Sequence, residues 1–168
     1  MIIYHGSTIT VDKPEILPSQ RMLDFGQGFY TTTNEEQAKR WARRVASRRK
    51  CDKHIVSVYE FDENKALAEL EVKRFERADE SWLEFVCICR SGKKASEDYD
   101  IVIGPVADDN VYATVQLFEL GILSKEEAVK RLKVEELYNQ ILFHTEKALK
   151  LCRFKNSYEI GGEDDGEK

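Results

Sequence analysis

Residues 25–33 read FGQGFYTTT, and this stretch decides the type of fold that we expect. Its two glycines, Gly26 and Gly28, predict a tight turn, and the aromatic and β-branched residues after them predict a strand. Asn34 follows as a helix N-cap, with Gln37 at the spacing of a capping box, and the helix runs to about residue 50. A turn, a strand and a helix in such close succession indicate a chain that mixes α and β structure.

The elements on either side have the same mixed character. A β-branched run at residues 2–5 predicts a first strand, which we expect Gly6 to end. Further strands are predicted at residues 55–61, within 67–75, at 99–106 and at 140–144, which is the final core strand. Further helices are predicted at residues 79–92, with Asp79 or Ser81 as the cap, from Asp108 or Asp109 to 120, from Ser124 onward, and after Thr145, before residues 151–154. The fold class predicted from these patterns is α+β.

The composition is that of one folded domain. The chain has 168 residues, of which 42% are hydrophobic and 34% charged, which is too apolar for wholesale disorder. We expect a domain at residues 1–155 and an acidic, disordered tail at residues 156–168. Residues 155–168 contain two bases and five acids, which gives −3 of the total net charge of −5. The body is therefore near neutral, and net charge favours no class of partner.

The start of the chain and its cysteines indicate which cellular compartment and which metal sites to expect. The chain begins Met-Ile-Ile-Tyr without a basic leader, and no apolar run approaches the roughly 18 residues of a spanning helix. We therefore expect a cytoplasmic protein that does not bind membranes. The four cysteines (Cys51, Cys87, Cys89 and Cys152) and three histidines show no zinc-site spacing. We expect reduced thiols, with Cys87 and Cys89 packed in an apolar helix, and no bound metal.

Three short motifs stand out from the scaffold, at residues 4–7 (YHGS), 25–30 (FGQGFY) and 137–140 (LYNQ). In this order they resemble the His-Tyr-Glu class of ADP-ribosyltransferases, which contains diphtheria toxin and the poly(ADP-ribose) polymerases. The first motif matches that class's His-Gly-Ser/Thr. The second matches its Phe-Gly-x-Gly-Ile-Tyr, with Trp41 eleven residues after Tyr30, where the class keeps a second aromatic. The third matches its Leu-Tyr-Asn-Glu, with Gln140 in place of the acid.

The whole chain, from residue 2 to about residue 154, resembles more closely the bacterial family called domain of unknown function 3990. The strings that carry this resemblance are YHGS, DFGQGFYTTT, QAKRWA, DYDIVIGPVADD and FHTEKAL. The resemblance implies an ADP-ribosyltransferase-like fold, in which two short antiparallel sheets form a split core and helices are inserted between the strands.

The resemblance also implies NAD+ as substrate and gives residues their roles. His5 would hydrogen-bond ribose hydroxyls, the backbone of Gly6 would hold the carboxamide, and Ser7 would add a ribose contact. Tyr30 and Trp41 would sandwich the nicotinamide ring, because flat aromatic side chains orient the ring that they stack on. Trp41 also fits a core anchor of its helix. The expected NAD+-binding residues are His5, Gly6, Ser7, Phe29, Tyr30 and Trp41, and the expected catalytic residues are His5, Tyr30 and Gln140.

Gln140 departs from the class pattern, in which an acid accepts a hydrogen bond from the ribose 2′-hydroxyl. An amide accepts that bond but brings no charge and cannot act as a base. Polymer elongation is therefore not expected, whereas mono-ADP-ribosylation stays open because several members of the class work without the acid. Glu135, Glu136 and Glu146 are candidate substitutes. His144 falls on the same strand face as Gln140, where it either assists or caps the next helix.

Three functions remain open. The first is a mono-ADP-ribosyltransferase that modifies a protein or nucleic acid, as the toxin of a bacterial toxin-antitoxin or defence pair with an antitoxin protein as partner. The second is a catalytically silent module of the same fold that binds NAD+, ADP-ribose or a protein. The third is a nucleic-acid binder that uses the seven basic residues between Lys39 and Lys50. That basic face also fits a solvated surface or a site for the NAD+ diphosphate.

Overall fold

The computed structural model describes residues 1–18, 23–93, 98–106, 109–132 and 139–161. The strands are β1 (Ile2–Ser7), β2 (Phe29–Thr31), β3 (Ile55–Phe61), β4 (Val72–Arg74), β5 (Ile101–Pro105), β6 (Asn139–Phe143) and β7 (Cys152–Glu159). The helices are α1 (Glu35–Arg49), α2 (Glu63–Glu69), α3 (Glu80–Arg90), α4 (Asp109–Glu119), α5 (Lys125–Leu132) and α6 (Glu146–Leu149). Within these residues no helix combines the length and the apolar character that crossing a membrane requires.

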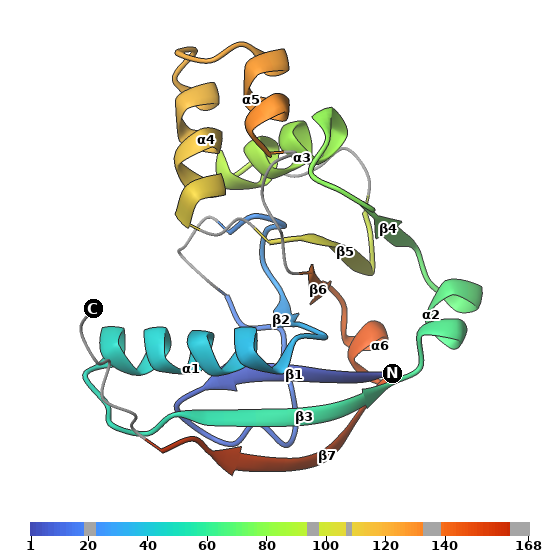
Figure 1. The fold of residues 1–168 in the computed structure, drawn as a ribbon. Helices are drawn as coiled ribbons and strands as arrows, with labels where there is room; N and C mark the ends of the chain where they lie inside the picture. Colours follow the sequence, from blue (N-terminus) through green and yellow to red (C-terminus); the bar gives the residue numbers. More distant parts are fainter. Residues whose placement is uncertain (19–22, 94–97, 107–108, 133–138, 162–168) are drawn as a thin grey trace.

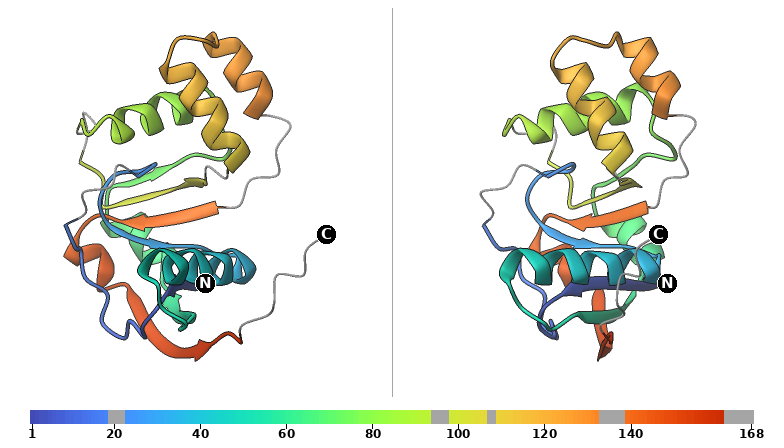
Figure 2. Two further views of the ribbon diagram at one scale, coloured as in Figure 1. Left: turned by 90° about the vertical axis from the view of Figure 1, so that its left-hand side faces the viewer. Right: turned by 60° about the vertical axis from the view of Figure 1, so that its left-hand side comes forward.

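The strands form two small sheets, which confirms the α+β class. A three-stranded sheet in the order β1-β3-β7 lies below a four-stranded sheet in the order β2-β6-β5-β4 (Figure 1). Helices α3, α4 and α5 gather beyond the four-stranded sheet, whereas α1 lies along the three-stranded one (Figures 1 and 2). The molecule is therefore layered, with the four-stranded sheet in the middle.

Gly6 fixes how α1 packs on the three-stranded sheet. We expected it to end the first strand, but β1 continues through Gly6 to Ser7 and pairs with β3 along its whole length. A Cβ atom on Gly6 would lie 2.0 Å from the carbonyl oxygen of Ala38 and 2.7 Å from the amide nitrogen of Ala42. Any side chain here would separate α1 from β1, so this glycine serves a close approach of helix and strand rather than a turn.

The four-stranded sheet is mixed, so the prediction of two antiparallel sheets is wrong for this one. β6 runs antiparallel to both β2 and β5, but β4 runs parallel to β5. Parallel neighbours need a crossover connection, usually a helix, and α3 lies between β4 and β5 in the chain. The apolar helix predicted at residues 79–92 is therefore also the crossover connection that allows β4 and β5 to run in the same direction.

Buried apolar side chains form one cluster on each face of the four-stranded sheet. Because side chains alternate along a strand, neighbouring residues of one strand belong to different clusters. The inter-sheet cluster lies between the sheets and contains Ile3, Phe29, Tyr59, Phe61, Ile101, Ile103, Ile141 and Phe143 among others. The helix-side cluster packs under α3, α4 and α5 and contains Phe25, Trp82, Leu83, Val86, Val102, Val115 and Leu142 among others. Successive residues of β5 and β6 thus enter different environments.

Most predicted helix ends are confirmed. Asn34 caps α1 by accepting the amide of Gln37 at 2.9 Å, Asp79 caps α3, and Thr145 caps α6. Ser124 and Glu127 form the full capping box of α5, with reciprocal bonds of 2.9 and 3.2 Å. The expected box at Asn34 does not form, because the side chain of Gln37 turns inward and accepts a hydrogen bond from Thr32 instead.

Two segments differ from the sequence-based expectation. Residues 63–69 form helix α2, capped by Asp62, where we expected only a strand later in the segment. β7 continues to Glu159, so residues 156–159 belong to the sheet and not to the expected tail. Main-chain hydrogen bonds hold this edge strand in the sheet although its side chains show no apolar alternation, so the sequence carries no strand signal here. Next along the expected tail, Ile160 donates its amide to the backbone oxygen of His54 at 2.9 Å, and residues 162–168 lie outside the described residues.

Candidate functional site

The two sheets meet at a short junction between β1 and β2, formed by residues 4–7 and 29–32. Tyr4 and Thr32 exchange two backbone hydrogen bonds, of 2.8 and 3.0 Å. Within the described residues, this bridge is the one point where β1 pairs with β2. The β1–β2 junction therefore holds the first two sequence motifs together, although they are about twenty residues apart in the chain.

His5 is fixed at the β1–β2 junction by its ring. Its Nδ1 atom lies 2.7 Å from the backbone oxygen of Tyr30, and its ring lies against that of Phe29 with centroids 4.5 Å apart. Burial lowers the pKa of His5, the Tyr30 hydrogen bond opposes this shift, and the positive charge of Arg49 adds to it. The imidazole is therefore neutral near pH 7. Because a carbonyl only accepts, Nδ1 carries the proton and Nε2 is left as a hydrogen-bond acceptor.

The backbone of Gly6 faces the side of β1 away from β3. In an antiparallel ladder, the N–H and C=O of successive residues point to alternate sides. Tyr4 directs both groups to Thr32, so Gly6, two residues on, directs both to that same side. No strand of the described chain pairs with Gly6 there, although the residue is buried. A buried donor and acceptor without a strand partner are unusual and suit a planar amide ligand. Ser7, which is buried at 7% exposure, follows on the face of His5.

The turn before β2 uses the hydroxyl of Tyr30. This hydroxyl donates to the backbone oxygen of Gly26 at 2.7 Å and accepts from the amide of Phe25 at 3.2 Å. Burial raises the pKa of Tyr30 well above its ordinary value, so the phenol stays neutral. Gly28 is also required, because a Cβ atom there would lie 2.4 Å from the backbone oxygen of Phe143. The Gly-x-Gly motif therefore forms a tight turn, and hydrogen bonds from the Tyr30 phenol to its backbone stabilise this turn.

Gln140 lies on the other face of the sheet from His5. Along β6, Ile141 and Phe143 enter the inter-sheet cluster, so Gln140 shares the helix-side face with Leu142. Its side chain is 2% exposed and donates from Nε2 to the backbone oxygen of Pro105 at 3.3 Å. No hydrogen bond or ring contact between described residues joins Gln140 to His5 or Tyr30. The structure thus brings His5, Gly6, Phe29 and the backbone of Tyr30 together, and directs the side chains of Tyr30 and Gln140 toward the helices.

Trp41 lies at the border of the buried face of α1. The fully buried residues of this helix are Gln37, Ala38, Ala42 and Ala46, whereas Trp41 and Val45 are only partly covered. The sequence predicts an inward face of Ala38, Trp41, Ala42 and Val45. The two alanines are fully buried as expected, whereas the two larger side chains lie at the border, because β1 approaches this helix too closely for a large residue. Among the ring contacts of the described residues there is none between Trp41 and Tyr30.

The candidate substitutes for the acid fall in different places. Glu146 is exposed in α6, where its carboxylate accepts from the amide of Ile16 at 3.4 Å. His144 follows β6 and hydrogen-bonds the backbone of Gln27, so it braces the turn before β2, while Thr145 caps α6. Burial lowers the pKa of His144. Glu135, Glu136 and the first two residues of the third motif, Leu137 and Tyr138, lie outside the described residues.

Sequence reasoning missed a polar network next to the β1–β2 junction. The hydroxyl of Thr32 lies 2.7 Å from Oε1 of Gln37 and 2.8 Å from the backbone oxygen of Asn139, and the Asn139 side chain accepts from Thr33 at 2.7 Å. Gln37 is 4% exposed, and its Nε2 has no hydrogen-bond partner. The repeated threonines of residues 31–33 were read as strand formers, and only the fold reveals their hydroxyls as links between β2, α1 and β6.

Arg49 is a second residue of this region that the motifs did not single out. It was counted as one of seven basic residues of its helix, but its Nη1 donates to the hydroxyl of Thr8 at 3.1 Å. Thr8 directly follows β1, so Arg49 brings a positive charge beside the β1–β2 junction, as its effect on the pKa of His5 reflects. Lys39, at the other end of α1, pairs instead with Glu35 and Glu36 of the same helix.

Comparisons with known proteins give a family but no function. A family described as "Protein of unknown function (DUF3990)" matches residues 1–154. Neither curated proteins nor solved structures give a match. Within the described residues, no group of three or more histidine, cysteine, aspartate or glutamate side chains is arranged to hold a metal ion.

Proposed function

We propose that this chain, which belongs to the DUF3990 family, is a mono-ADP-ribosyltransferase that cleaves NAD+ and transfers ADP-ribose to a macromolecule. The observation that carries the proposal is the β1–β2 junction, where a neutral histidine with a free acceptor nitrogen stands beside an unpaired main-chain donor and acceptor. These are the groups that the first motif would need in order to hold a ribose and a carboxamide.

His5 and Gly6 supply complementary contacts in this proposal. Nε2 of His5 accepts a hydrogen bond from a ribose hydroxyl, since its Nδ1 proton is held by Tyr30 at 2.7 Å. The N–H and C=O of Gly6 pair with the oxygen and the NH2 of the nicotinamide carboxamide. Two such bonds fix the plane of the ring, which positions the ribose bond for cleavage.

The charge of Arg49 suits the rest of the substrate. Its guanidinium reaches Thr8 at 3.1 Å, directly after β1, where a diphosphate would gain charge-assisted hydrogen bonds. In the reaction, the bond between the ribose C1′ and the nicotinamide nitrogen breaks, and nicotinamide leaves with the bonding electrons. A nucleophilic atom of the acceptor bonds to C1′ and loses its proton to solvent.

A second function, a silent module that binds NAD+ or ADP-ribose, is favoured by Gln140. Its amide is buried against Pro105 and lies on the face away from His5, so it brings no negative charge to the β1–β2 junction. Stabilisation of developing positive charge is a major source of catalysis in this chemistry. A protein that lacks it would bind the substrate and release it unchanged.

The decisive experiment combines calorimetry with NAD+ and transfer of labelled ADP-ribose to a cell extract. We expect saturable binding and slow labelling by the wild type, and loss of both in His5→Ala, while Gly161→Ala serves as a control because nothing lies within 4 Å of that position. Saturable binding of NAD+ without turnover identifies the silent module. Absence of both binding and turnover refutes both functions.

The acceptor and the cellular setting belong to the same proposal. If the protein is a toxin, its expression in bacteria should slow growth, and His5→Ala should restore it. Mass spectrometry of the labelled fraction, with and without nuclease treatment, then distinguishes a protein acceptor from a nucleic acid. Equal growth of cells that express the wild type and His5→Ala contradicts the toxin role, whereas the proposed enzyme activity is decided separately by the labelling assay.

A further inference from the structure

Helix α1 carries a basic surface, of which the proposed NAD+ chemistry uses one end. Seven of the 26 bases of the chain and none of its 31 acids lie in residues 37–51. Lys39 pairs with Glu35 and Glu36 in the first turn of the helix. The other six cations are exposed or partly exposed, and we call them the α1 basic face: Arg40, Arg43, Arg44, Arg48, Arg49 and Lys50.

Part of this charge has no counter-charge. Among the described residues, no acid forms an ion pair with Arg43, Arg49 or Lys50. Arg43 and Lys50 are seven residues apart, or about two helical turns, so they lie on the same side of α1. Arg48 and Arg49 in the last turn also suit the dipole of the helix, but this does not account for Arg43 in its middle. Such a surface attracts a partner that carries several negative charges.

The composition of the α1 basic face distinguishes between classes of partner. The exposed large apolar side chains of the described chain all lie outside α1. The core of a protein interface is poor in charge and rich in aromatic residues, whereas nucleic-acid interfaces are polar and strongly positive. Five of the six cations are arginines, whose planar guanidinium groups bind phosphate with two hydrogen bonds and also stack on unpaired bases. This composition fits a nucleic-acid strand better than an acidic protein.

The α1 basic face lies beside the β1–β2 junction. The helix runs along β1 (Figure 1), so closely that a Cβ atom on Gly6 would lie 2.7 Å from the amide nitrogen of Ala42. At the end of α1, Arg49 donates to the hydroxyl of Thr8, directly after β1, at 3.1 Å. A strand that follows α1 therefore passes the groups that would hold NAD+.

We propose that the α1 basic face binds the phosphate backbone of a single-stranded nucleic acid. Arg43 and Lys50 contact phosphates, and because phosphates carry no sequence information, binding does not depend on base sequence. The position beside the β1–β2 junction makes the bound strand the acceptor of ADP-ribose, a part of the inference that rests on the proposed function. A nucleophilic nitrogen or oxygen atom of the strand bonds to C1′ and loses its proton to solvent, while nicotinamide leaves with the bonding electrons.

Fluorescence anisotropy of the full chain with short labelled single strands of RNA and DNA tests the binding. We expect saturable binding that weakens by about tenfold or more between 50 mM and 200 mM salt, as contact with about three phosphates requires. Arg43→Gln/Lys50→Gln should weaken binding by about tenfold and reduce the slope of log affinity against log salt by about 1.4. Lys65→Gln/Lys130→Gln, two exposed changes on α2 and α5 with the same change of charge, is the matched control. The tighter of the RNA and DNA strands identifies the source of the backbone.

Four results overturn the assignment. The first two are no saturable binding at 50 mM salt and binding that salt does not weaken. The third is an Arg43→Gln/Lys50→Gln protein that binds like the wild type although thermal unfolding shows that it is folded. The fourth is displacement of the strand by polyglutamate at an equal concentration of charge, which assigns the face to an acidic protein, since polyglutamate offers no bases for the arginines to stack on. A paired duplex that binds more tightly than the single strand contradicts the single-stranded partner.

A transfer assay separates this inference from the proposed NAD+ chemistry. Arg43→Gln/Lys50→Gln lies outside the proposed NAD+ contacts, so it should cleave NAD+ like the wild type while its labelling of the strand with ADP-ribose falls by about tenfold. His5→Ala should bind the strand normally and leave it unlabelled. Strand binding without NAD+ turnover refutes the proposed function and supports the binding face. NAD+ turnover with label on protein alone refutes the strand as acceptor.

Discussion

The two faces of the four-stranded sheet use their polar residues in different ways. On the inter-sheet face, His5 sits against Phe29 and keeps one ring nitrogen as an acceptor. On the helix side, the hydroxyl of Tyr30 and the amide of Gln140 are tied to the backbone oxygens of Gly26 and Pro105. Residues that are neighbours in a motif thus enter different environments, because side chains alternate along a strand. Adjacency in sequence therefore does not make Phe29 and Tyr30 parts of one binding surface.

The strongest test of this arrangement removes the contact that holds β1 under α1. Gly6→Ala places a Cβ atom 2.0 Å from the oxygen of Ala38, and the helix must move away from the strand. We expect a loss of more than about 3 kcal/mol in the free energy of unfolding, measured by urea denaturation. Gly161→Ala, in open space, should stay within about 0.5 kcal/mol of the wild type. A Gly6→Ala protein of wild-type stability would contradict the close packing of α1 on β1.

Gln140→Glu tests the buried amide on the helix side. The new carboxylate would be buried and would face the oxygen of Pro105, so we expect a loss of about 2–3 kcal/mol at pH 8. Burial raises the pKa of such an acid, and its protonated form donates to that oxygen, so the loss should shrink as the pH falls from 8 toward 4. The exposed change Gln116→Glu provides the control for denaturation curves at each pH. A loss that does not depend on pH would contradict this environment for Gln140.

Tyr30→Phe removes the hydroxyl that closes the turn before β2. The backbone oxygen of Gly26 and the amide of Phe25 each lose a partner in a buried region, and we expect a loss of about 1–2 kcal/mol. Tyr112→Phe, which removes a hydroxyl that accepts from Gln116 in an exposed pair, should cost less than about 0.5 kcal/mol. Thermal unfolding of both variants measures the difference. Equal effects would mean that the Tyr30 phenol does not support the turn.

The smallest effect concerns the pH dependence of stability near His5. The pKa of His5 and that of His144 are lowered in the folded protein, so the unfolded chain binds more protons as the pH falls through the ordinary histidine range. Stability should therefore decrease between pH 7.5 and pH 5.5, by an amount on the order of 1 kcal/mol. His5→Asn and His144→Asn should each flatten this slope in urea unfolding series. An unchanged slope in both variants would show that neither imidazole is held neutral.

Local chemistry made several elements predictable. Asn34, Asp79 and Thr145 cap the helices that they precede, and Gly121 follows α4 with a positive φ of 71°. The apolar run at β5 gave a buried strand. These signals act within a few residues, so they survive in any fold that contains the element.

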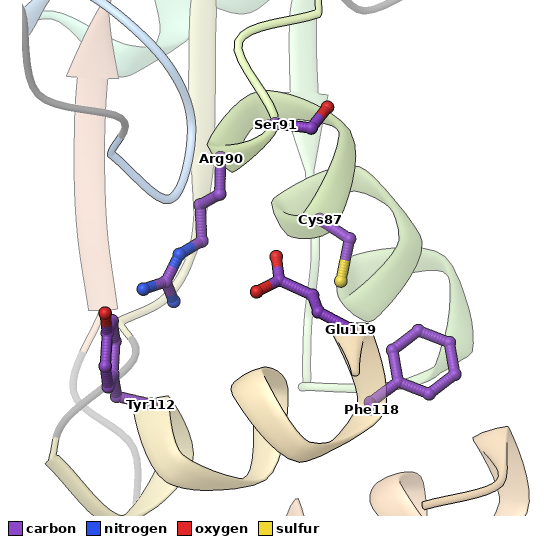
Figure 3. A pocket seen from close by; sticks show the side chains of 6 residues that line it. All are labelled: Cys87, Arg90, Ser91, Tyr112, Phe118 and Glu119. Atoms are coloured by element: carbon purple, nitrogen blue, oxygen red, sulfur yellow. The ribbon is translucent and has the colours of Figure 1, made fainter. Parts of the chain in front are cut away.

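Other features depend on partners far away in the chain. The parallel pairing of β4 with β5 and the continuation of β7 to Glu159 are made by backbone groups, which carry no residue-specific signal. Gly6 was read as a strand end because glycine commonly breaks strands, whereas the actual reason is the helix above it. The groove lined by Cys87, Arg90 and Tyr112 matches no sequence motif, since its lining comes from α3 and α4, two helices that the fold places side by side (Figure 3).

The sequence by itself determined the α+β class, the family, most helix ends and the candidate residues His5, Gly6, Tyr30 and Gln140. The tertiary structure decided which of them meet: the ring of His5 bonds the backbone of Tyr30, while the side chains of Tyr30 and Gln140 bond other carbonyls on the opposite face. The physical reason is that residue type fixes what a side chain is able to donate or accept, whereas strand register and the packing of helices fix the atom that it reaches.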